Sequence, residues 1–384
     1  MNENKCIYLD NAATTRVIPS VSEAAAGAMT EIYGNPSSLH RLGIDAERLI
    51  SYSKKQIMSA LGVTSDQGEI IFTSGATEGN NTAIFGVTET YGKRKKRVVT
   101  TTVEHPSVEK AFDRLAEKGY EVVRVSPDES GEITAESLIE SVNENTCLIS
   151  AMLVNNENGY ILPVAEAFLK IKKRFPECVT HCDCVQGFEK IPLSQKKLNA
   201  DIITMSGHKI HAPKGIGAMF IKKGIRLSPL MVGGGQQKGI RSGTEPVPMI
   251  YAFGKAVEIL NANLAERYSR AAEINSYARE KLLEIGTVIL SKETASPYVL
   301  SIAVPNIRSE TMLHFLEERN IFVSSGSACS KGKTSDVPTE FRIEEKYLDS
   351  IIRLSFSFET DESDIDTLAE AVSDGMKNLA KIRK

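Results

Sequence analysis

CVTHCDCV, residues 178–185, is a short apolar run rich in valine and cysteine, and the more polar segment QGFEK follows it. Similar β-rich runs recur on both sides of it, at EIIFT (69–73), RVVTTT (97–102), EVVRV (121–125), TCLISAMLV (146–154), DIITM (201–205) and GAMFIKK (217–223). Helix-length periodic segments lie between most of these runs, at 77–91, 107–118, 134–143 and 163–175. Strands that alternate with helices predict an α/β domain with a mostly parallel, buried sheet.

The pattern changes after this alternating region. Amphipathic helices are predicted at 17–33 and 44–61, before the first strand, and a long helix, either continuous or broken, is predicted at 247–286. A smaller α+β segment then runs to the C-terminus. A chain of 384 residues with 41% hydrophobic content is long enough for two domains. We therefore expect a large α/β domain at 16–250 and a small α+β domain formed by 1–15 and 251–384.

Composition limits the classes of function. A net charge of −3 gives no bulk electrostatic reason to expect nucleic acid or an anionic membrane, and we interpret the basic run GKRKKR (92–97) as a solvated turn. No apolar run approaches the roughly 18 residues of a membrane span, and the start MNENK does not resemble a signal peptide. The 6 cysteines, at positions 6, 147, 178, 182, 184 and 329, do not form a secreted disulfide pattern. A reducing cytoplasm fits this composition.

His181, Cys182 and Cys184 raise the question of a metal site, because His and Cys at this density are typical of zinc or iron–sulfur centres. Side chains alternate faces along a strand, so His181 and Asp183 share one face while the two cysteines point to the other. Ligands on two faces cannot surround one ion. Cα atoms two apart on a strand lie roughly 6.5–7 Å apart, which also disfavours a disulfide. We expect no metal here and two reduced, buried cysteines.

Polar residues follow several strands, at the edge where open α/β sheets bind ligands. They are Ser74, Gly75 and Thr77 in SGATEGNN, the Glu104-His105-Pro106 segment, Asn155, Asn156 and Glu157, Asp183 and Gln186, and the segment SGHKIHAPKGIG (206–217). Any one of these segments alone would be an ordinary set of polar loop residues. Together they supply a lysine for a Schiff base, a carboxylate for a pyridinium proton and donors for a phosphate, which are the parts that a pyridoxal phosphate (PLP) enzyme needs.

At this point the chain resembles a known family along almost its whole length. It resembles the NifS-like cysteine desulfurases, which have the class V aminotransferase type of PLP-dependent transferase fold. The motifs that carry the resemblance are YLDNAATT (8–15), GNPSSLHRLG (34–43), FTSGATEGNN (72–81), EHPSV (104–108), VNNENG (154–159), HCDCVQGFEKIP (181–192), SGHKIHAPKGIG (206–217), GGGQQKGIRSGTEPVP (233–248) and SSGSACS (324–330). Nine motifs in the same order are a specific match.

The resemblance implies a role for each residue that would surround the PLP ring. Lys209 would hold the cofactor covalently and move the substrate Cα proton. His105 would stack on the ring and assist proton transfer, and Val185 would lie against the opposite face. Asp183 would pair with the pyridinium N–H, and Gln186 would hydrogen-bond the phenolic oxygen.

The resemblance also implies which residues bind the phosphate of PLP and the carboxylate of the substrate. Thr77, Ser206 and His208 would bind phosphate, together with Thr244 from a partner subunit, which makes the active unit a homodimer. Asn156 and Arg353 would hold the carboxylate of L-cysteine, a task that suits a planar, permanently charged guanidinium.

Cys329 lies in FVSSGSACSKGKTS (322–335), among glycine, serine and lysine, where a cysteine is expected to be exposed and reactive. In this family such a thiolate attacks the substrate sulfur, and the products are L-alanine and a Cys329 persulfide. SSGSACS and the long segment that follows resemble the housekeeping, long-loop branch. TSDVPTEFRIEEKYLD (334–349) and SFET (357–360) depart from the family and leave the acceptor open.

Several alternatives remain open. A class V aminotransferase would keep Lys209 and Asp183 without needing Cys329, and a selenocysteine lyase would use the same loop on another substrate. The protein could also be an inactive scaffold for sulfur-trafficking partners, although every chemical position that the family uses is filled. The sequence does not choose between an iron–sulfur cluster scaffold and a thiolation enzyme as the sulfur acceptor, and it does not say whether an activating partner is needed.

Overall fold

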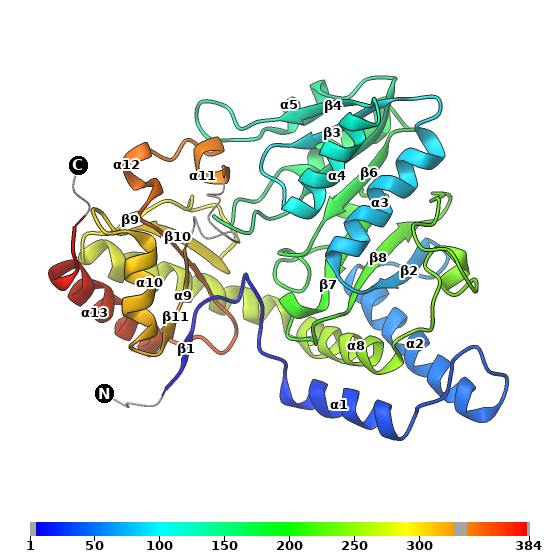
Figure 1. The fold of residues 1–384 in the computed structure, drawn as a ribbon, viewed down its shortest axis with the longest axis horizontal. Helices are drawn as coiled ribbons and strands as arrows, with labels where there is room; N and C mark the ends of the chain where they lie inside the picture. The colour runs from blue at the N-terminus through cyan, green and yellow to red at the C-terminus, as the bar shows by residue number, and fades with distance from the viewer. Residues whose placement is uncertain (1–4, 326–335, 382–384) are drawn as a thin grey trace.

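A seven-stranded sheet forms the centre of the computed structural model, which describes residues 5–325 and 336–381. The strand order is β2-β8-β7-β6-β5-β3-β4 (Figure 1). Neighbouring strands are parallel except at β8, which is antiparallel to both β2 and β7. The strands are β2 Gly68–Thr73, β3 Arg97–Thr101, β4 Glu121–Val125, β5 Thr146–Met152, β6 Val179–Asp183, β7 Ile202–Ser206 and β8 Gly217–Lys222. The predicted α/β fold with a mostly parallel sheet is confirmed.

Helices cover both faces of this sheet. One face packs against α3 (Ala76–Tyr91) and α4 (Pro106–Glu117), whose apolar side chains form one core cluster. The other face packs in a second cluster against α1 (Pro19–Thr30), α2 (Arg41–Ala60), α5 (Ala135–Glu140), α6 (Val164–Arg174), α7 (Gln195–Leu198) and α8 (Val247–Ala262). Every residue of β5 and β6 is buried, as expected for strands covered on both faces.

A second, antiparallel sheet has the order β12-β13-β10-β9 and its own core cluster. Its strands are β9 Val288–Ile289, β10 Val299–Ala303, β12 Ser324–Ser325 and β13 Ile351–Ser355, and its helices are α9 Leu264–Glu284, α10 Ser309–Glu317 and α13 Glu362–Asn378. The long helix expected at 247–286 is two helices, because Asn263 leaves the helical conformation between α8 and α9. The two sheets have separate cores, and α8 packs to Leu260 in the core of the large sheet, so the division at residue 250 stays a proposal.

The N-terminal segment links the two sheets. β1 (Ile7–Tyr8) pairs in parallel with β11 (Ile321–Phe322), and the chain then crosses toward α1 (Figure 1). Asn11 donates through Nδ2 to the carbonyl of Ser355, at 2.9 Å, and the amide of Thr15 donates to the carbonyl of His208, also at 2.9 Å. This crossing brings backbone of residues 11–15 to the carboxyl end of β7.

Short helices follow the part of the chain that the structure leaves out. They are α11 (Val337–Glu340) and α12 (Glu345–Leu348). Thr102, just beyond β3, donates to a carboxylate oxygen of Glu340 at 2.7 Å, and the ring of Phe341 lies 5.3 Å from that of Tyr160. The segment that departs from the family motif is therefore attached to the large sheet. Within residues 5–325 and 336–381, none of the helices combines the length and apolarity needed to span a membrane.

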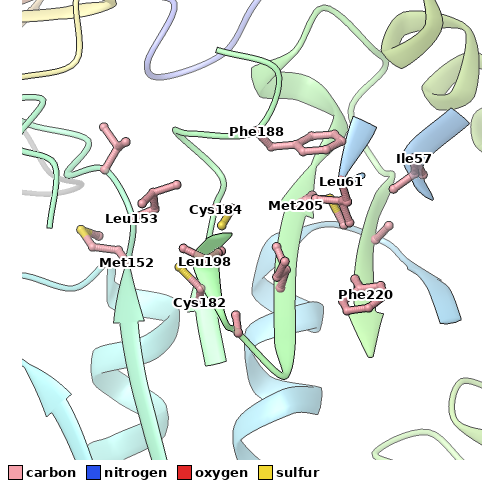
Figure 2. Packing of buried hydrophobic residues seen from close by; sticks show 14 of the residues in the cluster. Ile57, Leu61, Met152, Leu153, Cys182, Cys184, Phe188, Leu198, Met205 and Phe220 are labelled. Carbon is pink, nitrogen blue, oxygen red and sulfur yellow. The ribbon is translucent and has the colours of Figure 1, made fainter. Parts of the chain in front are cut away.

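The two cysteines of HCDC lie inside the core. Cys182 and Cys184 are 0% exposed, and Figure 2 shows them among Met152, Leu153 and Leu198. Both are free thiols. His181, on the other face of β6, has its ring nitrogens 2.7 Å from Ser150 Oγ and 2.9 Å from Thr204 Oγ1, and burial lowers its pKa to about 3. The predicted division of these side chains between two faces is confirmed.

Thiol labelling of the native protein should distinguish buried from accessible cysteines. Burial raises the pKa of Cys147 to about 11 and that of Cys178 to about 12, and it raises the pKa of Cys182 well above the ordinary value. Because the thiolate is the reactive form, we expect a maleimide to modify Cys6, which is exposed, and Cys329 well before Cys182 or Cys184. Time-resolved peptide mass spectrometry measures the order, and labelling in denaturant should reach all 6 cysteines. Labelling of Cys182 or Cys184 as fast as Cys6 would contradict this placement.

Candidate active site

Lys209 lies in a short turn, Gly207–Lys209, directly after β7. Its Nζ donates to the backbone carbonyls of Ala12 and Ala13, each at 2.6 Å. Burial, reinforced by the positive charge of Arg353, lowers the pKa of Lys209 to about 8. A larger fraction of this amine is therefore neutral near physiological pH than for an ordinary lysine, as a nucleophile or proton acceptor requires.

Asp183 ends β6, beside β7, and its side chain is buried on the face that α3 covers. Its carboxylate accepts two hydrogen bonds. Oδ2 accepts from Asn80 Nδ2 at 2.8 Å, and Oδ1 accepts from the amide of Val185 at 2.9 Å. Both donors orient a carboxylate at the carboxyl edge of the sheet, close to the turn that carries Lys209.

His105 follows β3 and is the N-cap of α4, where Pro106 occupies the first helical position. Its Nδ1 accepts from the amide of Ser107 at 3.1 Å. Burial lowers the pKa of His105; the charge of Asp183 opposes this shift and that of Lys209 adds to it. The lowered pKa favours the neutral imidazole, and the charges of Asp183 and Lys209 both act on it.

Gln186 follows Asp183 in the turn after β6. Its Nε2 donates to the carbonyl of Ala12 at 2.9 Å, and its Oε1 accepts from Lys190 Nζ at 2.8 Å. The carbonyl of Ala12 thus accepts from both Gln186 and Lys209. Lys190 is buried, and burial lowers its pKa to about 7.

The residues expected to bind phosphate also lie at this edge. Thr77 is in the first turn of α3, which begins after Gly75 with no side-chain cap. Ser206 pairs in register with Gly217, and a Cβ built on Gly217 would lie 2.8 Å from the Cα of Gly75. Gly217, at the start of β8, therefore lies next to both the start of α3 and the end of β7, and free amides at a helix start suit an anion.

His208 and Thr244 complete the predicted phosphate ligands. His208 lies next to Lys209, with Nδ1 3.3 Å from Thr14 Oγ1, and burial lowers its pKa to about 4. Thr244 is exposed, in the loop whose Arg241 donates to Glu78 of α3 at 2.9 Å. An exposed threonine is available to a second copy of the chain.

Arg353, in β13, reaches this edge from the second sheet. Its Nη1 donates to the carbonyl of Asn156 at 3.0 Å, and its Nη2 donates to Asp10 Oδ1 at 2.8 Å. Its buried Nε has no hydrogen-bond partner in the part of the chain that the structure describes. The two residues predicted to hold the substrate carboxylate are therefore in contact. Cys329 lies outside the described residues.

Sequence reasoning named Glu104 without giving it a role, and it missed Lys190 and the carbonyls of Ala12 and Ala13. Glu104 is buried, and it accepts from Thr101 Oγ1 at 2.6 Å and from the amide of Met152 at 3.0 Å. Burial raises the pKa of Glu104 to about 8. The signal in the sequence was position, since these residues lie inside motifs that we had singled out for other members.

Comparison with known proteins agrees with this geometry. The model of the family described as aminotransferase class-V matches residues 7–368. The NifS/IcsS protein homolog of Lactobacillus delbrueckii subsp. bulgaricus is 37% identical, over 98% of each chain. A cysteine desulfurase of Nostoc sp. is 36% identical, over 97% of this chain and 93% of its own. A solved structure of a NifS-like protein superposes with a TM-score of 0.92 at 35% identity and covers 98% of this chain and 100% of its own.

The strand-end lysine, aspartate and histidine, the family model and the full-length relatives lead to one assignment. The chain belongs to the aminotransferase class V family, as a NifS-like homologue of the cysteine desulfurases.

Proposed function

We propose that the protein is a PLP-dependent cysteine desulfurase, which converts L-cysteine to L-alanine and takes the sulfur onto Cys329 as a persulfide. The observation that carries the proposal is that Lys209 and Gln186 share the carbonyl of Ala12 at the sheet edge where Asp183 ends the neighbouring strand β6. Relatives named cysteine desulfurase over nearly the whole chain support the same activity.

The residues at this edge fit PLP. Asp183 accepts an N–H donor at each carboxylate oxygen, and these two hydrogen bonds fix the orientation of the carboxylate proposed to pair with the pyridinium N–H. Thr77 and His105 also line a cleft of about 470 Å³ along α3 and α4, whose lining does not include Lys209 or Asp183. We propose that Gln186 bonds the phenolic oxygen and that Val185 and His105 lie on the two ring faces. The phosphate would be held by Thr77, Ser206, His208 and, from a second copy of the chain in a homodimer, Thr244.

Bound PLP supplies an electron sink that makes the substrate Cα proton acidic. The chain's own residues do the rest. Lys209, whose pKa is lowered to about 8, accepts the Cα proton. Arg353 and Asn156 hold the substrate carboxylate, so that the Cα–H bond faces Lys209.

Cys329 acts as the nucleophile toward sulfur. Its thiolate forms an S–S bond with the substrate sulfur while the C–S bond breaks, and the carbon fragment leaves as L-alanine after protonation. The balance is one cysteine and one enzyme thiol giving one alanine and one persulfide. An acceptor protein, either an iron–sulfur scaffold or a thiolation enzyme, would then take the outer sulfur. This chemistry suits the cytoplasm, and Cys6, Cys147, Cys178, Cys182 and Cys184 are free thiols.

The direct test is incubation of the PLP-loaded protein with L-cysteine and dithiothreitol, with alanine and sulfide measured together. Equal amounts of the two products are expected. Alanine from selenocysteine but not from cysteine would favour the lyase, and amino transfer to an oxo acid without sulfide would favour the aminotransferase. A PLP-loaded protein that turns over none of these substrates would be the inactive scaffold.

A further inference from the structure

A hydrogen-bonded chain connects His105 to Asp183 on the face of the sheet that α3 and α4 cover. His105 Nδ1 lies 2.9 Å from Ser107 Oγ. Asn80 Nδ2 donates to Ser107 Oγ at 2.9 Å and to Asp183 Oδ2 at 2.8 Å. Asn80 and Ser107 are 0% and 9% exposed, so water does not compete freely for the hydrogen bonds of Asn80, whereas His105 itself is exposed.

The direction of each hydrogen bond follows from the donors available. An amide NH₂ has two protons, and Asn80 directs one to each of its partners. Reversing this amide would put its oxygen 2.8 Å from a carboxylate oxygen of Asp183, an arrangement of two acceptors that repel. The orientation of Asn80 is therefore fixed.

Because Asn80 is fixed, the hydroxyl of Ser107 is also oriented, and it in turn determines which nitrogen of His105 carries the proton. Because its Oγ accepts from Asn80, its hydroxyl proton is free to point at His105 Nδ1. Its backbone amide also donates to the same nitrogen, at 3.1 Å. Two donors on Nδ1 leave no room for a proton there, and a neutral imidazole must then carry its proton on Nε2.

We propose that Asn80 and Ser107 are positioning residues, which hold His105 as the Nε2–H tautomer and tie it to Asp183. The proposal rests on the proposed function, and it refines the role of His105. With Nδ1 occupied and Nε2 protonated, the imidazole offers a hydrogen-bond donor to the reacting groups and has no free lone pair to act as a base. Removal of the Cα proton then falls to Lys209 alone.

The tautomer can be observed without turnover. Selective ¹⁵N labelling of the 6 histidines, with His105→Gln to assign the signals, reports which imidazole nitrogen is protonated. We expect the proton of His105 on Nε2 in the full-length protein, with and without PLP. A wild-type His105 protonated on Nδ1, or an even mixture of tautomers, overturns the proposal. Because this readout needs no activity, it stands even if the desulfurase test fails.

Variants of Ser107 distinguish a role in positioning His105 from a role in packing alone. Ser107→Ala should lower kcat for alanine formation roughly 10-fold with KM nearly unchanged and broaden the tautomer population, whereas Ser107→Thr, which keeps the hydroxyl, should restore both. Ser137→Ala is the matched control, since Ser137 lies in the first turn of α5 and donates to the carbonyl of Thr134 at 2.9 Å. Loss in Ser107→Thr equal to that in Ser107→Ala would assign the effect to packing.

Asn80 and Ser107 should act as one unit. If they do, the double variant Asn80→Ala/Ser107→Ala loses about as much kcat as the worse of the two single variants. Circular dichroism of each variant establishes that it is folded. Effects that add in the double variant would show two independent roles and contradict a single chain from Asp183 to His105.

Discussion

Lys209→Ala is expected to abolish covalent attachment of PLP and to lower alanine formation by roughly 10³-fold or more. Lys209 Nζ lies at the meeting point of β7 and the N-terminal segment, and its lowered pKa, about 8, suits both bond formation and proton transfer. The measurement is borohydride reduction of the PLP-loaded protein followed by peptide mass spectrometry. Wild type should carry the reduced cofactor on the peptide that contains Lys209.

Lys214→Ala is the matched control for this variant. Lys214 lies in the same glycine-rich segment, but its side chain is exposed, so its removal should leave PLP attached. Reducible PLP retained in Lys209→Ala would place the covalent link on another lysine. Lys190 would be the first to test, because it is also buried with a pKa lowered to about 7.

Cys329→Ala should separate cofactor chemistry from sulfur transfer. The variant should bind PLP and L-cysteine as wild type does, because the residues proposed for those tasks are untouched. Formation of alanine and of the persulfide should fall to near background, since no thiol remains to take the substrate sulfur. Absorbance changes on adding L-cysteine report binding, and alanine and cyanolysable sulfur report turnover.

Cys6→Ala is the control for that experiment. Cys6 is the exposed cysteine among those that the structure describes, and its loss should leave both products unchanged. Alanine made by Cys329→Ala at the wild-type rate would mean that the nucleophile lies elsewhere, and it would strengthen the lyase alternative.

The sheet and the site edge could be predicted from the sequence because both have local signatures. A strand covered on both faces must be apolar throughout, so the polar residues that follow it mark the strand end. The period of two also fixed which face of β6 each side chain takes, and Asp183 and Cys182 lie as that period requires. Arg353 was harder to predict, and we identified it from the family resemblance alone.

The rest of the site could not be read from the sequence, for a physical reason. The acceptors of Lys209 are backbone carbonyls of Ala12 and Ala13, and every residue has a carbonyl. Burial of Lys190 and Glu104 depends on how α-helices and the N-terminal segment close over the sheet, whereas such residues are usually exposed. The Asn80–Ser107 chain needs three elements, α3, α4 and β6, to meet in space.

The N-terminal crossing has a consequence for how the protein is made. β1 is synthesised long before its partner β11. Asn11 likewise cannot form its hydrogen bond to Ser355 until that residue, 344 positions later in the chain, has been synthesised. The large sheet, by contrast, is complete once residue 222 has emerged. A nascent chain can therefore build most of its core, and can bond Ala12 to Gln186 and Thr15 to His208, before Asn11 gains its partner at Ser355. Arg353 of β13 reaches the site only near the end of translation, so a chain truncated before β13 has the sheet and Lys209 without the guanidinium proposed to hold the substrate carboxylate.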